Sequence, residues 1–388
     1  MDYQKKELPK KFSTIGWALV ALGIIIVVVS YFVNPMRTSF NNVIALMFMT
    51  GISVGALVLV ALEHLSGAVW STPMRRVSEF LAASIPFVAI LAIPLLFNLH
   101  GLFEWTHTDV VKNDANLLGK TPYLNTGFFI IRYVVFFAVL FLFYFIFTRN
   151  SRKQDDTKDQ SYTRKNVKFS AGFMPVAAIV LSFLAIDWMM SLSPHWYSTI
   201  FGIYYITATL LAGLAATTYA VVRLNEKGYL HSSIGPDHYY SFGALLFGMT
   251  NFWAYIAFSQ FMLIWYANIP EETTWFIMRW TGGWKYVSIA MIVIRFAIPY
   301  FGLLTARAKT DPKRLKIVSI IILAAHLFDM YWLVMPTYSD TALFSFFEIG
   351  FPVLIIGILI VVFSFQAKKH NLIPIGDPKL QRGLDFHL

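Results

Sequence analysis

The chain has 388 residues, of which 57% are hydrophobic and only 13% are charged, and its mean hydropathy is +0.61. This composition is far from that of a soluble globular domain and predicts an integral membrane protein. The net charge of +10 does not indicate nucleic-acid binding, because the basic residues are scattered over several loops, where they would face anionic lipid.

Several function classes are excluded by residues and motifs that the sequence lacks. Without cysteine there is no disulfide, no thiolate-bound iron–sulfur cluster and no CxxCH haem attachment. A b-type haem would need two histidines at similar depth, whereas the two candidates, His64 and His326, are predicted at very different depths. No Walker loop, GxGxxG or HExxH is present, so an ATPase, a dinucleotide enzyme and a zinc protease have no support. We therefore expect no bound metal and no redox centre in this chain.

Ten apolar runs are each long enough to cross about 30 Å of hydrocarbon as a helix. They lie at residues 13–33, 42–62, 77–97, 126–148, 170–192, 199–223, 239–266, 285–306, 315–335 and 344–366. With both termini in the cytoplasm, the basic residues on outer segments are only Arg37, Lys112, Lys120, Arg279 and Lys285. This asymmetry fits the positive-inside rule and predicts an all-α, polytopic membrane protein. The first run lacks a small-residue cleavage site, so we expect it to be a retained anchor.

The loops suggest how the spans are grouped. The inner segment 151–168 is polar and highly charged, so we expect a mobile linker between two halves. The predicted divisions are residues 1–41, a tail and the first span; 42–192, a four-helix bundle that includes the charged linker 149–169; 193–336, a second four-helix bundle; and 337–388, the last span and a tail. Both bundles start and finish outside, so the repeat is predicted to be parallel rather than inverted.

Two aspartates in apolar helices are the best markers of this repeat. Asp187 in AIDWMMSLSP and Asp329 in LFDMYWLVMP each lie about seven residues, or roughly 10 Å, inside the outer end of the last helix of a bundle. The preceding helix of each bundle carries one arginine. Depth allows Arg132 to pair with Asp187, and Arg295 to pair with Asp329 or to lie near His326. A charge at this depth is a functional-site hypothesis by default.

Two interpretations of these residues are open. They could be buried ion pairs that fix helix register, or they could transfer protons. His326 and Asp329 are three positions apart and share a helix face, where an imidazole and a carboxylate could accept protons from a hydroquinone. A quinone ring would suit the neighbouring apolar side chains, although these are also typical of plain helix packing: Trp188, Met189, Met190, Tyr331 and Trp332.

Further polar groups lie near the ends of the spans. Glu63, His64 and Glu79 on the inner side could take up protons, although such residues often mark only a solvated helix end. Asp340 and Glu348 on the outer side could release protons, with the same alternative. Buried hydroxyls could connect the two sides through water, or could simply be small residues at helix contacts: Thr50, Ser53, Ser84, Thr207, Thr209, Thr217 and Thr218. The aromatic outer segments 100–125 and 267–284 could lie at the headgroups or meet an external partner.

The stretches DWMMSLSPHWYSTIFGIYY (187–205) and AFSQFMLIWYANIPEETTWF (257–276) resemble the second NrfD-like membrane subunit of bacterial alternative complex III, also called quinol:cytochrome c oxidoreductase quinone-binding subunit 2. The resemblance covers essentially the whole chain. It implies ten spans in two four-helix bundles, and a role for Asp187 and His195 in the quoted motif.

The resemblance also implies a setting. The protein would be a subunit of a complex in the bacterial cytoplasmic membrane that oxidises menaquinol or ubiquinol and passes electrons to cytochrome c or a terminal oxidase. Its partners would be a sister NrfD-like subunit, an iron–sulfur subunit and multihaem cytochrome c subunits, and these would hold the haems and clusters. This subunit would contribute an outer quinone pocket, a proton path, or both. Two other functions stay open: a secondary transporter, and a purely structural membrane anchor.

Overall fold

The computed structural model describes residues 7–388, which form helices and, within that range, no strand. Ten helical segments are long and apolar enough to cross a membrane, and each coincides with one of the ten predicted runs. The prediction of an all-α, multi-pass membrane protein is therefore confirmed. Part of the predicted N-terminal tail, residues 1–6, lies outside the described residues.

The ten spans are α1 (Lys10–Val33), α2 (Pro35–Ser66), η1 with α3 and α4 (Thr72–Leu96), α8 (Thr126–Thr157), α9 with η3 (Ser161–Leu192), α10 (Phe201–Glu226), α11 (Pro236–Ala267), α13 with η4 and α14 (Trp284–Gly302), α16 with η5 (Pro312–Thr337) and α17 (Phe347–Lys369). The divided spans consist of η1 (Thr72–Met74), α3 (Arg75–Ala82) and α4 (Ile85–Leu96); α9 (Ser161–Trp188) and η3 (Met190–Leu192); α13 (Trp284–Ile292), η4 (Val293–Ala297) and α14 (Ile298–Gly302); and α16 (Pro312–Val334) and η5 (Met335–Thr337). Short helices lie outside the spans: α5 (Leu99–Leu102), η2 (Glu104–Thr106), α6 (Thr108–Asn113), α7 (Ala115–Lys120), α12 (Pro270–Met278), α15 (Ala306–Thr310) and α18 (Leu380–Leu384).

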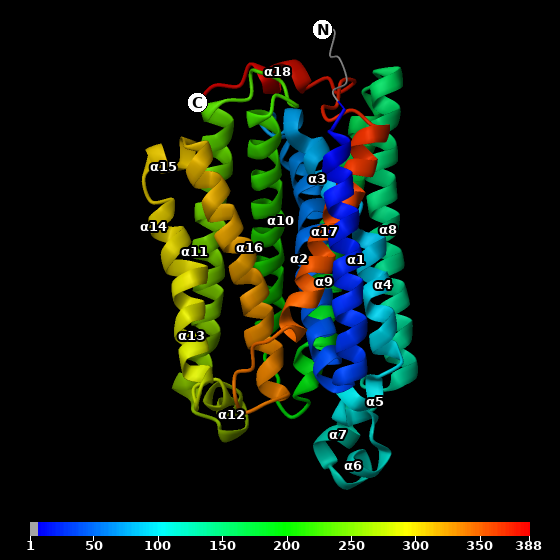
Figure 1. Cartoon of the computed structure of the whole chain (residues 1–388), viewed down its shortest axis with the longest axis vertical. Coiled ribbons are helices and arrows are strands. Elements are labelled where there is room, and N and C mark those ends of the chain that lie inside the picture. Colours follow the sequence, from blue (N-terminus) through cyan, green and yellow to red (C-terminus); the bar gives the residue numbers. More distant parts are fainter. Residues whose placement is uncertain (1–6) are drawn as a thin grey trace.

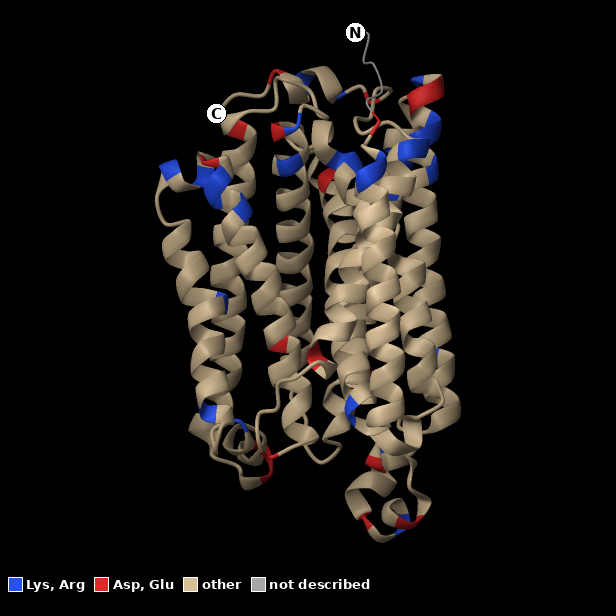
Figure 2. Ribbon diagram, in the orientation of Figure 1, with Lys and Arg blue, Asp and Glu red and all other residues tan. Residues whose placement is uncertain are grey.

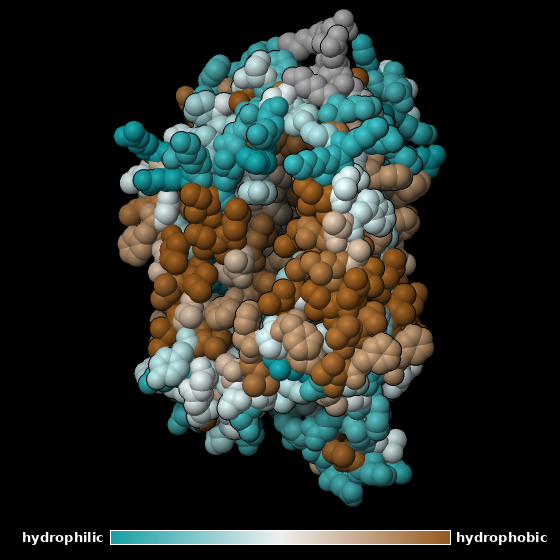
Figure 3. Space-filling view, in the orientation of Figure 1, coloured by the Kyte–Doolittle hydropathy of each residue, from teal (hydrophilic) through white to brown (hydrophobic). Residues whose placement is uncertain are grey.

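The two ends of the helix bundle differ in charge. The start of α1 and the C-terminal α18 lie at the same end, the upper one in Figure 1. Lys and Arg residues gather at this end, as Figure 2 shows, and we call it the basic end and the other the opposite end. Between the two ends the surface is a belt of hydrophobic residues (Figure 3). This distribution is typical of a protein that spans a bilayer.

The helix α2 is at the centre of the packing. An apolar stretch of 18 residues in α2 is 94% buried. The helix contacts α3, α4, α9, α10 and α16. On one side α8 packs against α4 and α9; on the other, α10 and α16 pack together, and α11 and α14 complete that group. The pair α1 and α17 lies outside these groups, and α1 contacts mainly α17. The core therefore depends on α2 and α10, and the first and last spans flank it (Figure 1).

Glycines allow the closest helix contacts. A Cβ on Gly213 of α10 would lie 2.6 Å from the Cα of Gly55 on α2, so the two backbones touch there. A Cβ on Gly23 of α1 would lie 2.6 Å from the Cα of Leu354, and one on Gly357 of α17 would lie 2.6 Å from the backbone nitrogen of Val20. Small residues permit such approaches in membranes, where helices associate through close packing and not through exclusion of water.

The prediction that residues 151–168 form a mobile linker is wrong. The helix α8 continues to Thr157 and α9 begins at Ser161, so only residues 158–160 connect them. Polar contacts hold this extension in place: the side chain of Gln154 donates to the Thr163 hydroxyl at 2.7 Å, and Ser151 is buried. Hydropathy predicts a loop for this polar segment because it reports where a helix leaves the membrane and not where the helix ends.

The second predicted span also begins earlier than expected. The predicted span and bundle start at residue 42, whereas α2 begins at Pro35 and follows α1 after Asn34 alone. Asn34 caps α2 by accepting a hydrogen bond from the backbone nitrogen of Arg37, and proline is favoured in the first helical turn. The polar residues Thr38 and Asn41 stay in the helix because their side chains donate to backbone carbonyls one turn earlier.

Candidate functional site

Arg132 and Asp187 form a buried ion pair towards the opposite end of the bundle. Arg132 on α8 donates from Nε and Nη2 to the two carboxylate oxygens of Asp187 on α9, both at 2.9 Å. The Tyr123 hydroxyl donates to the same carboxylate at 2.8 Å, and the Arg132 guanidinium lies 3.9 Å from the centre of the Tyr123 ring. Such a two-pronged geometry is the strongest that an arginine and a carboxylate make. The pairing that helix depth allows is therefore present.

A cavity of about 310 Å³ adjoins this pair. Tyr123 lines it together with Met190, Trp196 and other mostly apolar side chains; the remaining lining residues are Gly119, Lys120, Pro122, Leu124, Ile186, Ser191, Pro194 and Tyr197. Burial raises the pKa of Tyr123 well above its usual range, and the negative charge of Asp187 raises it further. The tyrosine therefore stays protonated, so one side chain both lines the cavity and donates its hydroxyl proton to the Asp187 carboxylate.

The second acid, Asp329 on α16, lies in a different kind of group. Its carboxylate accepts a hydrogen bond from the Tyr204 hydroxyl at 2.5 Å, and the Nε atom of Arg295 is 3.3 Å away. The Nη2 atom of Arg295 lies 3.4 Å from Nδ1 of His326, and the guanidinium is 4.6 Å from the centre of the Trp253 ring. Arg295 thus contacts both partners that depth allowed. We call Tyr204, Arg295, His326 and Asp329 the Asp329 group.

Arg295 lies on a local distortion of its helix. The turn η4, Val293–Ala297, is a π-helix, and Pro299 follows four residues after Arg295. Proline cannot donate the backbone hydrogen bond that the Arg295 carbonyl would accept in a regular α-helix, so the turn widens here. Single π turns inside α-helices occur frequently at functional sites.

Several polar atoms of the Asp329 group have no hydrogen-bond partner. They are Nε and Nη1 of Arg295, Nε2 of His326 and Oδ2 of Asp329, and their residues are at most 1% exposed. The 3.3 Å contact between Arg295 and Asp329 is an ion pair but lacks the geometry of a hydrogen bond. Nε2 of His326 faces Gly51 on α2 so closely that no Cβ would fit there. Buried polar atoms are normally satisfied, so this group is suited to water or to an exchangeable proton.

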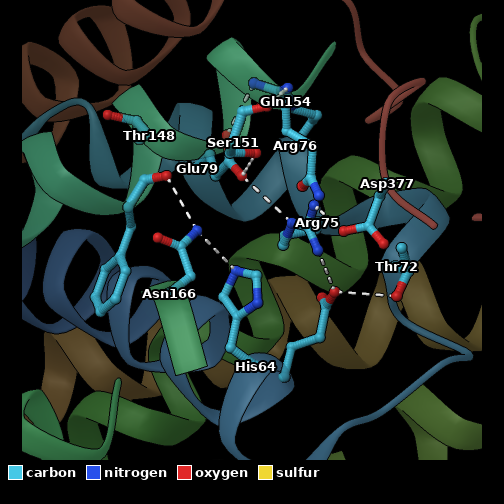
Figure 4. Close-up of polar contacts among 12 residues, drawn as sticks. His64, Thr72, Arg75, Arg76, Glu79, Thr148, Ser151, Gln154, Asn166 and Asp377 are labelled. Atoms are coloured by element: carbon cyan, nitrogen blue, oxygen red, sulfur yellow. Dashed lines mark hydrogen bonds and ion pairs between the residues drawn. The ribbon is translucent and has the colours of Figure 1, made fainter. Parts of the chain in front are cut away.

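A third polar group lies at the basic end, and it is shown in Figure 4. Arg75 on α3 contacts three carboxylates: Glu63 at 2.9 Å, Glu79 at 3.4 Å and Asp377 at 2.7 Å. Arg76 contacts Glu79 at 3.1 Å and Asp155 at 2.6 Å. We call these six residues the basic-end network. It holds four carboxylates and two guanidinium groups, so in the fully charged state its acids outnumber its cations.

The alternative that Glu63, His64 and Glu79 mark solvated helix ends is wrong. Glu63 is 7% exposed, His64 3% and Glu79 not at all. Nε2 of His64 lies 3.3 Å from the side-chain nitrogen of Asn166 on α9. The C-terminal segment and the extended ends of α8 and α9 cover these residues. The prediction ends each helix at the membrane surface, so it misses the segments that bury these side chains. Proton uptake here stays a prediction.

Hydroxyl groups lie between the basic-end network and the Asp329 group. Ser78, next to Glu79 on α3, lies 3.2 Å from Thr217 on α10. Nearer the middle of the bundle, the hydroxyls of Ser53 and Ser84 are 2.6 Å apart. The other predicted hydroxyls are also buried: Thr50, Thr207, Thr209 and Thr218. The side chains thus provide hydrogen-bonding groups at several depths between α2, α3 and α10.

The remaining predicted residues lie apart from these groups. Glu348 is 8% exposed and is bound by Arg37 through two hydrogen bonds of 3.0 and 2.8 Å, so it is not a solvated end. Asp340 is exposed in the loop before α17. His195 is also exposed, and its Nε2 lies 3.3 Å from the carboxylate of Asp114. The resemblance grouped His195 with Asp187, but the structure places it in the loop after η3, outside the buried pair.

Sequence reasoning missed several residues of these groups. Tyr123 and Tyr204 were not considered, although each hydrogen-bonds one of the two aspartates. Arg75 and Asp377, which bind each other, were not considered as site residues either. Arg279, counted as an outer loop residue, is 1% exposed and donates to the backbone carbonyls of Trp332 and Leu333 at the end of α16. The only available signal was that Arg75 and Arg76 directly precede an acid at helical spacing.

Fold and site together define a multi-pass helical membrane protein with buried charged groups at two depths. Within residues 7–388, no group of three or more His, Cys, Asp or Glu residues could hold a metal ion. The sequence matches no known protein family model, and no characterised protein is significantly similar to it.

Proposed function

We propose that this chain is the NrfD-like membrane subunit of a quinol-oxidising respiratory complex, in a bacterial cytoplasmic membrane with both termini cytoplasmic. One observation carries the proposal: Tyr123 lines an apolar cavity of about 310 Å³, and its hydroxyl is bonded to the Asp187 carboxylate. Ligand pockets are typically lined by apolar and aromatic side chains with a few polar groups, and this cavity has that character.

The chemistry assigns this subunit a proton-handling role. Oxidation of a hydroquinone releases two electrons and two protons. A chain without cysteine has no thiolate-bound cluster, so the electrons pass to iron–sulfur and multihaem partner subunits and on to cytochrome c or a terminal oxidase. The protons pass to hydrogen-bonding groups at the ring. In the proposed site a quinol hydroxyl bonds to Tyr123, which bonds to Asp187, while Arg132 holds the carboxylate in place.

The Asp329 group supports a second candidate function, proton transfer between the two sides of the membrane. Its unpartnered atoms and the hydroxyls towards Glu79 are the specific observations in favour. In this case Glu63, His64 and Glu79 take up protons, His326 and Asp329 carry them, and Glu348 and Asp340 lie on the release side. The two functions are compatible in one subunit, since they use different residues.

The proposed repeat of two parallel four-helix bundles is supported by the matching ion pairs. In each half the last helix carries the aspartate, and the preceding span carries the arginine. We propose that a sister NrfD-like subunit, an iron–sulfur subunit and multihaem cytochromes bind around this frame.

The first test is purification from native membranes in mild detergent, followed by identification of co-purifying proteins, a visible spectrum and a quinol oxidation assay. Tyr123→Phe and Met190→Trp test the cavity, because the first removes the hydroxyl and the second fills the space. Asp340→Asn is the matched control, since Asp340 is exposed. We expect slower quinol oxidation with Tyr123→Phe, a raised KM with Met190→Trp and no change with the control.

Three results would redirect the proposal. Full quinol oxidation by both cavity variants would place the quinol site elsewhere. A chain that purifies alone, without haem, and takes up a solute in liposomes would be a secondary transporter. Variants that always lose assembly and activity together, and never activity alone, would leave a structural anchor.

A further inference from the structure

The C-terminal segment that follows α17 does not leave the protein. Residues 370–388 turn back across the basic end, and Figure 1 shows α18 lying over the helix ends. Leu372 and Ile373 are 2% and 1% exposed, and Leu384 near the end of the chain is 4% exposed. A polar tail with no partner would stay in solvent. This segment is instead packed as part of the protein, and we call it the C-terminal strap.

The first attachment of the strap is at Gly376 and Asp377. Asp377 is 5% exposed and binds Arg75 at 2.7 Å, as Figure 4 shows. The backbone nitrogen of Gly376 donates to Asp155 at 3.2 Å, and Gly376 is pressed against the carbonyl of Gln154 so closely that no side chain would fit. Burial alone would raise the pKa of Asp377, but the charge of Arg75 outweighs burial and holds this pKa below its usual range. The ionised carboxylate is therefore the form that docks.

The second attachment is at Gly383, six residues after Asp377. The strap helix α18 packs against η1, and a Cβ on Gly383 would lie 2.6 Å from the carbonyl oxygen of Val69 and 2.7 Å from Cδ of Pro73. The Gly383 carbonyl also accepts a hydrogen bond from Nε2 of His238 at 2.8 Å. The two attachments use different partners, because these contacts of Gly383 involve Val69, Pro73 and His238 and none of the six network residues.

The strap covers the side of the network that would otherwise face water. Arg75 is 3% exposed and Thr72, whose hydroxyl donates to Glu63 at 3.2 Å, is not exposed at all. Arg75 needs the third carboxylate, because without Asp377 one edge of its guanidinium would lose its partner. Release of the strap would therefore open the network and at the same time free a hydrogen-bonding edge of Arg75 for water.

From these contacts we infer that the C-terminal strap is a closing device: docked through Asp377 and Gly383 it keeps water out of the basic-end network, and released it admits water to Glu63, Arg75 and Glu79. Whatever the protein transfers, the strap controls whether water reaches a buried group. This access can be measured directly, without an assay of turnover.

The absence of cysteine gives a clean background for this test. A single Thr72→Cys substitution in the full chain, purified in mild detergent, places a thiol under the strap. Its rate of modification by a small charged methanethiosulfonate reports access. Trypsin cleavage at Lys379 and Arg382, both in the strap, reports release. We expect slow modification in the Thr72→Cys chain and a rate about tenfold or more higher when either attachment is broken, as for a local opening that becomes easier.

Two variants break the attachments separately. Asp377→Ala removes the contact to Arg75, and Gly383→Leu forces the strap away from Val69 without touching the network. Asp385→Ala is the matched control, because Asp385 is exposed and its carboxylate accepts a hydrogen bond from Gln381 within the strap itself. A strap that trypsin shows to be released while the Thr72→Cys thiol stays protected would overturn the inference. The inference would also be overturned if neither variant released the strap. The same holds if the Thr72→Cys thiol reacted as fast with an unaltered strap as it does in the two variants.

Discussion

The buried pair of Arg132 and Asp187 gives the sharpest energetic prediction. Asp187→Asn keeps the shape of the side chain but leaves Arg132, which is 6% exposed, without its carboxylate. Removing one partner of a buried pair typically costs about 3–5 kcal/mol. Arg132 keeps its hydrogen bond to the Tyr123 carbonyl at 2.8 Å and its position over the Tyr123 ring, so we expect a value at the low end, about 3 kcal/mol.

The measurement is equilibrium unfolding in mixed micelles of mild detergent and SDS, with the unfolding free energy compared between variants. Asp109→Asn, on the exposed helix α6, is the control and should change it by less than about 0.5 kcal/mol. The double variant Asp187→Asn with Arg132→Gln removes the stranded charge and should recover at least about 1 kcal/mol relative to the single variant. An unchanged unfolding free energy for Asp187→Asn, or a double variant less stable than the single one, would refute the reasoning.

Three further predictions concern other parts of the fold. Gly357→Leu should detach α1 from α17 without unfolding the other spans, because a side chain at position 357 meets the backbone of α1. The detachment is measured as increased protease sensitivity of α1, and unchanged sensitivity would contradict the prediction. Arg279→Lys should lower the unfolding free energy by about 1–3 kcal/mol, since an ammonium cannot reproduce the forked contacts to the carbonyls that end α16; a loss below about 0.5 kcal/mol would count against it. Because the pKa of docked Asp377 lies below its ordinary 3.8, the contact to Arg75 stabilises the strap at every pH above that value and is lost only as pH falls through the lower, docked pKa. The difference in strap hydrogen exchange between the unaltered chain and Asp377→Asn, corrected for intrinsic rates, should therefore be constant from neutral pH to about 4 and shrink only below it, and a change in this difference near pH 6 would contradict the assignment.

The spans and the ion pairs could be predicted because they follow from local rules. Hydropathy identifies helices that cross a bilayer, and the depth of a charge along a helix limits which charges it can meet. Both rules use one coordinate, the distance along the membrane normal. They found the partner of Asp187 and the two neighbours of Arg295, each on a helix that runs beside its own.

The groups at the basic end could not be predicted because they depend on chain segments far apart in sequence. The charge rule assigns Arg75 to a cytoplasmic loop, and nothing local indicates that Asp377 returns to meet it. Glu63 is buried because the C-terminal segment folds back over it. The tyrosines were missed for a related reason: Tyr123 lies before its span and Tyr204 on another helix, so neither shares a periodic pattern with its aspartate.

The pairing of α1 with α17 has a consequence for how the protein is made. A chain is synthesised from its N-terminus, so α1 leaves the ribosome before the other nine described spans, and its main packing partner, α17, follows all of them. Throughout synthesis α1 must persist in the bilayer with most of its surface against lipid, which its nearly uncharged, uniformly apolar sequence allows. The glycine contacts of this pair can therefore form only after the eight spans between them have been synthesised.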